Sequence, residues 1–228
     1  MLKSFDNLEV PCFLFPPAQI AKGKETSKAG FFEGLRPPKK YPVIIYVPPP
    51  SLQFQRGFNS QAQVFANLGF YFAAINYRGC DGYGAKYSKL ASTQDAARDV
   101  LMLRERLIKN PNVDAENIFL TTTSGGMAVV TELMATKPNY WRGAGLNTPG
   151  SVNIDKRFQP GKLPPMVMIM GGQDGALDSM KAFASWAATN AVELKTVIHT
   201  NAGHVAYSLD DRTDAQRQMV DFFLSHLK

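Results

Sequence analysis

The chain of 228 residues has few of the features that mark specialised classes of protein. Its only cysteines are Cys12 and Cys80, which excludes a disulfide framework, and we expect both thiols to be free. No apolar run approaches the roughly 20 residues that a membrane-spanning helix needs, and the N-terminus carries no apolar signal segment. We therefore expect a cytoplasmic protein that does not engage a membrane.

Positive charge is in modest excess, and it is not concentrated. The net charge is +6, yet no run of Lys or Arg is longer than two residues. Scattered cations are typical of a solubilising surface, whereas a nucleic-acid site needs a basic patch or a recognisable motif. We expect no nucleic-acid partner, and the sequence does not indicate an oligomeric state.

Short apolar runs alternate with segments of helical periodicity. Strands are predicted at residues 8–15, 43–47, 70–77, 118–121, 143–147, 166–170 and 194–199. Helices are predicted at residues 60–68, 93–109, 127–136, 179–191 and 214–227. This alternation predicts an α/β fold with a mostly parallel central sheet and helices on both faces. Pro11 marks the first strand as an edge strand, because proline cannot donate to a strand ladder.

The segment 117–128 carries the strongest chemical signal. An apolar run ends in Thr122-Thr123-Ser124-Gly125-Gly126, and a helix-compatible segment follows at once. This order is typical of a nucleophile elbow, a sharp turn that presents a serine hydroxyl at the edge of a sheet. The usual pattern is Gly-x-Ser-x-Gly, so Thr122 replaces the first glycine. A Ser-Gly-Gly turn that serves packing alone is the competing interpretation.

Two further residues follow strands in the manner that such a serine requires. Asp174 comes after the predicted strand at 166–170, and His204 comes after the strand at 194–199. Both therefore lie at the carboxyl edge of the sheet, in the chain order Ser, Asp, His of α/β-hydrolases. Taken singly, Asp174 could cap the next helix or close a turn with Gly175, and His204 could be structural. His199 and His226 are its rivals, the first packed at a strand end and the second near a helix C-terminus.

A longer motif identifies a resemblance. Residues 76–84, Asn-Tyr-Arg-Gly-Cys-Asp-Gly-Tyr-Gly, are similar to a motif of the prolyl oligopeptidase family of serine peptidases, within the α/β-hydrolase fold. Further matches lie at 5–11, 40–47, 113–118, 171–174 and 203–204. The resemblance implies Ser124 as nucleophile, Asp174 as orienting acid and His204 as general base. It implies cleavage of peptide or ester bonds through an acyl-enzyme, with no cofactor and no metal.

The sequence departs from the family pattern around the oxyanion hole. Where the family carries His-Gly-Gly-Pro or a tyrosine-containing equivalent, this chain has Pro48-Pro49-Pro50-Ser51. Proline has no backbone N–H, so the Gly125 N–H is the one donor that the pattern retains. The candidates to replace the missing donor are Gln53, Gln55 and the Ser51 N–H. Aligning the two glycines differently places Thr123 at the nucleophile position, but counting from Val113 favours Ser124.

Two functional hypotheses follow from these observations. The first is a serine hydrolase that acts on a peptide or a small acyl substrate. The alternative is a catalytically impaired binding or interaction module that keeps the fold with a degraded oxyanion hole. We expect one domain over residues 1–228, with residues 1–41 as an N-terminal strand and a loop leading into the core, and with no β-propeller.

Overall fold

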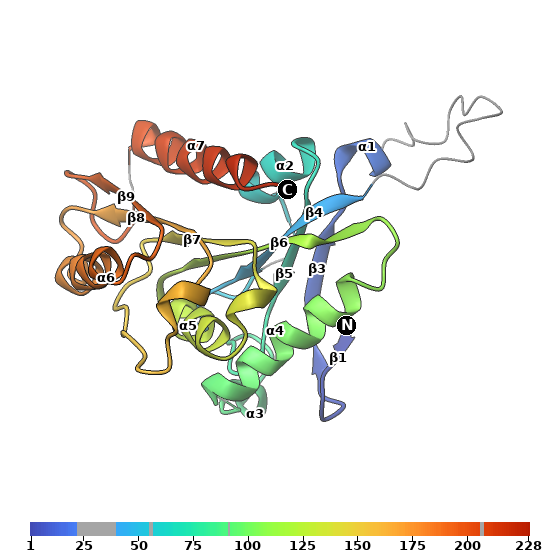
Figure 1. Cartoon of the computed structure of the whole chain (residues 1–228). Coiled ribbons are helices and arrows are strands. Elements are labelled where there is room, and N and C mark those ends of the chain that lie inside the picture. The colour runs from blue at the N-terminus through green and yellow to red at the C-terminus, as the bar shows by residue number, and fades with distance from the viewer. Residues whose placement is uncertain (22–39, 55–56, 91, 206–207) are drawn as a thin grey trace, which may run out of the picture.

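A seven-stranded sheet forms the centre of the molecule (Figure 1). The computed structural model describes residues 1–21, 40–54, 57–90, 92–205 and 208–228. The strand order is β3-β5-β4-β6-β7-β8-β9. The strands are β3 (Cys12–Phe15), β4 (Tyr41–Val47), β5 (Tyr71–Ile75), β6 (Val113–Thr123), β7 (Gly143–Asn147), β8 (Met166–Gly171) and β9 (Leu194–His199). Only β3 runs antiparallel to its neighbour among these strands, so the predicted mostly parallel sheet is confirmed.

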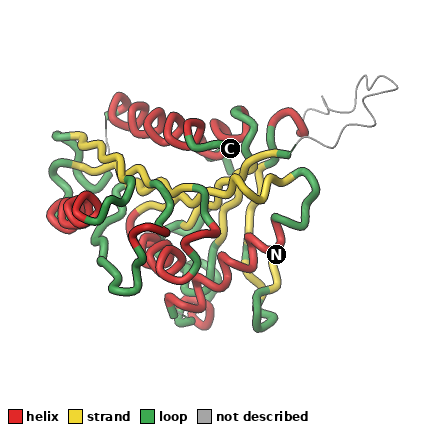
Figure 2. Tube along the Cα trace, in the orientation of Figure 1, coloured by secondary structure: helices red, strands yellow, loops and turns green. Residues whose placement is uncertain are grey.

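Helices cover both faces of this sheet (Figures 1 and 2). On one face lie α2 (Ser60–Asn67) and α7 (Leu209–Ser225), and on the other α4 (Thr93–Leu107), α5 (Met127–Thr136) and α6 (Leu177–Thr189). Shorter elements are α1 (Ala18–Ala21), α3 (Ala85–Ser88), and the 3₁₀ turns η2 (Ser124–Gly126), η3 (Pro138–Tyr140) and η4 (Pro160–Lys162). In the described part of the chain, no helix has the length and apolar character that crossing a bilayer requires.

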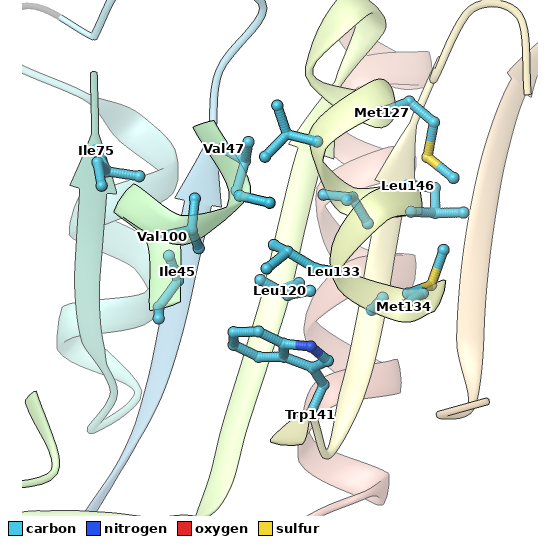
Figure 3. Close-up of a cluster of buried hydrophobic side chains, with 14 of the residues drawn as sticks. Ile45, Val47, Ile75, Val100, Leu120, Met127, Leu133, Met134, Trp141 and Leu146 are labelled. Atoms are coloured by element: carbon cyan, nitrogen blue, oxygen red, sulfur yellow. The ribbon is translucent and has the colours of Figure 1, made fainter. Parts of the chain in front are cut away.

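Two hydrophobic clusters, one on each face, hold the layers together. Successive residues of β4 divide between them: Ile45 belongs to the cluster under α4, α5 and α6, and Ile44 to the cluster under α2 and α7. Figure 3 shows the first cluster, in which Leu120 from β6 and Leu133 from α5 meet above Trp141. Each fully buried aliphatic side chain contributes about 1.5–3 kcal/mol. Because both sheet faces are covered, the strands read in the sequence as continuous apolar runs.

The N-terminal region differs in detail from the prediction. The single strand expected at 8–15 is divided by Pro11 into β2 (Glu9–Val10) and β3. The first of these pairs with β1 (Leu2–Lys3) in a separate hairpin, whereas β3 forms the edge of the main sheet. The divided strand follows from proline, which has no N–H to donate to a ladder.

The loop predicted to follow the first strand, up to residue 41, begins and ends differently in the structure. At its start the structure has the helical turn α1, and at its end Tyr41 already belongs to β4, so the prediction is wrong at both ends. Pro17 precedes α1 and its carbonyl oxygen accepts a hydrogen bond from the Ile20 N–H, as expected where proline opens a helix. Residues 22–39 lie outside the described residues.

Candidate active site

Ser124 lies at a sharp turn between the end of β6 and the start of α5. Its backbone φ is +50°, a left-handed conformation that costs a non-glycine residue about 1–3 kcal/mol. The preceding Thr123 is extended, with φ −134° and ψ 141°. The Ser124 N–H donates to the carbonyl oxygen of Thr148, 3.0 Å away beyond β7, which holds the turn in place. This is the backbone geometry expected of an elbow, with Ser124 rather than Thr123 at its tip.

Close packing explains the small residues after the serine. A Cβ added to Gly126 would lie 2.4 Å from the Val47 carbonyl oxygen and 2.5 Å from the Thr122 Oγ1. The helix therefore approaches β4 more closely than any side chain allows. Thr122, which replaces the usual first glycine, is fully buried and donates its hydroxyl to the same Val47 oxygen at 2.8 Å. The β-branched residue is accommodated because its hydroxyl has this partner.

His204 bridges Ser124 and Asp174. Its Nε2 lies 2.8 Å from the Ser124 Oγ, and its Nδ1 lies 2.7 Å from the Asp174 Oδ2. The acid stands in the loop after β8 and the histidine in the loop after β9, so the carboxyl edge of the sheet brings all three residues together. The structure therefore places side by side the three residues singled out in the sequence.

Asp174 divides its two carboxylate oxygens between two partners. Oδ2 contacts His204, whereas Oδ1 accepts a hydrogen bond from the Ala176 N–H at 2.9 Å, just before α6. Asp174 is not the cap of α6, whose N-cap is Ala176 without a side-chain cap hydrogen bond; its Oδ1 instead closes a turn through Gly175, while Oδ2 serves the contact expected of a triad. The side chain of Asp174 is 3% exposed, while that of His204 is 43% exposed. The acid is thus shielded from water, and the imidazole remains accessible to a substrate.

The two rival histidines have other partners. His199 ends β9, and its Nε2 lies 3.0 Å from the Asp214 Oδ2 of α7. His226 follows α7, where Nδ1 lies 2.7 Å from the Phe222 carbonyl oxygen and Nε2 lies 2.9 Å from the Glu193 Oε1. Both histidines tie α7 to its surroundings.

The proline turn, Pro48 to Pro50, is hydrogen-bonded to the loop after β5 and packs against the elbow. The carbonyl oxygen of Pro48 accepts from the Tyr77 hydroxyl at 2.9 Å, and that of Pro50 accepts from the Asp81 N–H at 2.8 Å. A Cβ added to Gly125 would lie 3.3 Å from the Pro50 Cδ. The turn thus presents its ring atoms, not N–H groups, toward Gly125.

The three groups named as candidates to replace the missing oxyanion donor are Gln53, Gln55 and the Ser51 N–H. The Gln53 amide packs against Gly82, because a Cβ added there would lie 2.4 Å from the Gln53 Nε2. Ser51 is exposed in the turn. Gln55 lies outside the described residues.

The loop after β5, which carries the motif at residues 76–84, holds the proline turn in place. Asn76 is fully buried and exchanges hydrogen bonds with both the N–H and the carbonyl oxygen of Phe54. Arg78 is buried against Asp99, with Nε to Oδ2 at 2.9 Å and Nη2 to Oδ1 at 2.8 Å. Breaking one side of such a buried pair costs about 3–5 kcal/mol. The motif therefore fixes the shape of the loop.

Tyr77 has a structural role that was not predicted from the sequence: its hydroxyl binds the proline turn. Burial raises the pKa of its hydroxyl above the usual range, so the group remains a hydrogen-bond donor to Pro48 at every physiological pH. No local sequence pattern predicts this contact, because it joins residues 29 positions apart. In the described residues, no cluster of three His, Cys, Asp or Glu side chains could hold a metal ion.

Comparison with known families agrees with this geometry. A model of the prolyl oligopeptidase family matches residues 56–159, which include Ser124 and the motif at 76–84 but neither Asp174 nor His204. No curated protein sequence matches the chain significantly.

Solved structures of peptidases share the fold. An acylaminoacyl peptidase from Pyrococcus horikoshii is 19% identical with a TM-score of 0.78, over 100% of this chain and 41% of that one. Dipeptidyl peptidase 4 from Porphyromonas gingivalis is 16% identical with a TM-score of 0.76, over 99% of this chain and 35% of that one. A puromycin-hydrolyzing peptidase from Mycobacterium tuberculosis is 14% identical with a TM-score of 0.79, over 97% of this chain and 38% of that one.

The chain spans 35% to 41% of the length of these three structures. At these identities the likeness is one of fold, and the predicted α/β-hydrolase fold is confirmed. The resemblance to the prolyl oligopeptidase family is confirmed as well, by the family model together with the structural neighbours.

Proposed function

We propose that this chain is a serine hydrolase that cleaves peptide or ester bonds through an acyl-enzyme, with Ser124, His204 and Asp174 as its catalytic residues. The observation that carries the proposal is the pair of contacts made by His204, 2.8 Å to the Ser124 Oγ and 2.7 Å to the Asp174 Oδ2. The similarity to peptidases supports the same reaction class.

The chemistry follows from the order of these contacts. Asp174 accepts the Nδ1–H of His204, which leaves the lone pair of Nε2 directed at the serine hydroxyl. As the Ser124 Oγ attacks the substrate carbonyl carbon, Nε2 takes the hydroxyl proton and the imidazolium is stabilised by the carboxylate. The same proton then passes to the leaving amine or alcohol. Water next attacks the acyl-enzyme with Nε2 as base, and Ser124 recovers its proton.

The oxyanion formed in each step needs hydrogen-bond donors. We assign the Gly125 N–H to this role, because it follows the nucleophile at the start of the helix. The proline turn supplies no N–H from Pro49 or Pro50. Lacking one donor costs roughly 100- to 1000-fold in turnover, so we expect a slow enzyme unless a substrate brings a second donor into place.

A fluorophosphonate probe tests the proposal directly, because it phosphonylates a serine that a neighbouring base has activated. We expect labelling of the folded wild-type chain and none of Ser124→Ala, with Ser51→Ala labelled like the wild type. Absence of labelling in folded wild-type protein would refute the enzyme and leave the alternative, a binding module that keeps the fold. A paired library of acyl peptides and acyl esters then identifies which bond is cleaved.

A further inference from the structure

A cavity of about 350 Å³ opens beside His204 at the carboxyl edge of the sheet. Its walls come from the ends of β6, β7, β8 and β9, the start of α2, one side of α7 and the loop that carries His204. Among the described residues, they include Thr123 and His204 but neither Ser124 nor the proline turn. The cavity therefore lies on the histidine side of the serine, away from the turn that packs on Gly125.

This position identifies which part of a substrate reaches the cavity. In acyl transfer the imidazole Nε2 gives its proton to the leaving group, while the acyl group stays bound to the serine. Nε2 of His204 lies 2.8 Å from the Ser124 Oγ, so a leaving group protonated there stands at the mouth of the cavity. The fragment attached to that leaving group extends along the cavity wall.

The wall combines buried apolar side chains with one buried polar group that lacks a partner in the described residues. Ala215 and Met219 of α7 are buried together with Ile169 of β8. On the same helix the Gln216 Nε2 is buried and has no hydrogen-bond partner in the described residues. A buried amide N–H without an acceptor is destabilising, and turning the Gln216 side chain toward the cavity would let a ligand oxygen supply the acceptor.

Charge on the wall has one sign. The titratable side chains that line the cavity are His199, His204 and Arg212, with no carboxylate among the described lining residues. Two acids that contact residues of this site already have partners: Asp174 contacts His204, and Asp214 contacts both His199 and Arg217. Over the described ranges, no carboxylate comes within 4 Å of the Arg212 guanidinium. Arg212 is thus a cation without an acidic partner within 4 Å at the rim of the cavity.

We propose that this cavity binds the leaving fragment of the substrate and that Arg212 selects a fragment that carries a carboxylate, with the Gln216 amide as a second donor. The carboxylate is either the free C-terminus of a peptide or an Asp or Glu side chain close to the cleaved bond. This proposal rests on the serine hydrolase function proposed above. Because Arg212 is exposed, we expect a preference of about 5-fold, weaker at high salt.

Binding to the Ser124→Ala protein tests the cavity without any turnover. The ligands are the peptide Ala-Ala-Ala with a free C-terminus and its C-terminal amide, followed by the amides of Glu-Ala and Gln-Ala, titrated by NMR at low salt. A tighter Kd for the free acid than for its amide identifies a C-terminal carboxylate, and a tighter Kd for Glu-Ala amide than for Gln-Ala amide identifies an acidic side chain. Either preference supports the proposal.

Variants assign the preference to one residue. Arg212→Gln in the Ser124→Ala background should abolish it, and Arg212→Lys should restore part of it. Arg98→Gln removes the same charge from α4, on the opposite face of the sheet, and should leave it unchanged. Absence of binding, equal Kd values within both pairs, or a preference that survives Arg212→Gln would overturn the proposal.

A kinetic experiment separates this proposal from the function on which it rests. Hydrolysis of a p-nitrophenyl ester, whose leaving group carries no carboxylate, should be the same in Arg212→Gln and in the wild type. For peptides, kcat/KM should fall about 5-fold in Arg212→Gln only when the leaving fragment is acidic. If the wild-type protein hydrolyses no substrate but its Ser124→Ala variant still binds acidic ligands more tightly, the hydrolase function is refuted. The proposal that Arg212 binds a carboxylate then stands.

Discussion

The hydroxyl of Tyr77 donates a hydrogen bond to the carbonyl oxygen of Pro48, 2.9 Å away, and so joins the loop after β5 to the turn beside Ser124. Both groups are buried. A second hydrogen bond, from the Asp81 N–H to the Pro50 carbonyl oxygen, joins the same loop to the proline turn that packs on Gly125. The position of the turn therefore depends on residues of the motif at 76–84.

Tyr77→Phe should lower the free energy of unfolding by about 1–3 kcal/mol, because the buried Pro48 carbonyl oxygen loses its partner. It should also slow fluorophosphonate labelling of Ser124, since the turn beside the elbow is released. Tyr87→Phe is the matched control, because its hydroxyl donates to the Asn76 carbonyl oxygen at 2.7 Å. We expect both variants to lose stability in urea, but only Tyr77→Phe to label slowly. Equal labelling of the two would show that the turn does not depend on this bond.

Asp174→Asn should leave stability nearly unchanged while it lowers turnover by about 10⁴-fold. The amide keeps an acceptor for the Ala176 N–H, so the start of α6 survives, but it no longer holds His204 with the Nε2 lone pair toward the serine. Asp178→Asn removes an exposed acid from the same helix and should be silent in both measurements. Rapid hydrolysis by Asp174→Asn would contradict the assigned role of Asp174.

Gly126→Ala should destabilise the fold by about 1–3 kcal/mol, the usual cost of overpacking. Its Cβ would meet backbone oxygens of Val47 and Pro48 at 2.4 Å and 2.8 Å, and backbone cannot move aside as a flexible side chain can. Gly161→Ala serves as the control, because nothing lies within 4 Å of the added Cβ. Chemical unfolding of the two variants measures the difference, and equal midpoints would mean that the elbow tolerates a wider gap.

Asp6→Asn should weaken the fold in a pH-dependent way. The Arg78 guanidinium lowers the pKa of Asp6 from 3.8 to about 2, so the stabilisation is complete above pH 3.8 and is lost as pH falls toward 2. The side chain is 43% exposed, which limits the loss near neutral pH to less than about 1 kcal/mol. Urea unfolding at neutral pH and at low pH should show the two proteins converging. Glu9→Gln, in the same hairpin, should show no such convergence.

Much of the sheet could be predicted, because burial on both faces leaves an unmistakable apolar run. The predicted strands at 143–147 and 194–199 agree with β7 and β9 to the residue. By contrast, β6 begins at Val113, five residues before the predicted start, because exposed polar residues such as Glu116 interrupt the apolar pattern. The predicted start of α7 at residue 214 is also late. The true start has its own signal, since the Ser208 hydroxyl caps the Asp211 N–H.

The site residues could be proposed from chain order, but their support could not. Three residues at strand ends must meet at one sheet edge, so topology alone brings Ser124, Asp174 and His204 near one another. The residues of the cavity wall could not be predicted in this way. Arg212 reaches it only because α7 packs across the strand ends, and no local pattern in the sequence records that packing angle.

The extreme N-terminus is tied to the same loop that supports the proline turn. The Ser4 hydroxyl bonds to Asp99, and Asp6 pairs with Arg78, so the first hairpin closes over the buried guanidinium. Trimming the chain by protease to residue 7 would remove both partners at one cut and admit water to the Arg78–Asp99 pair. We expect this cleavage to slow hydrolysis although it lies far from Ser124 in the sequence. The mass of the protein, measured before each kinetic experiment, should therefore show that residues 1–7 are present.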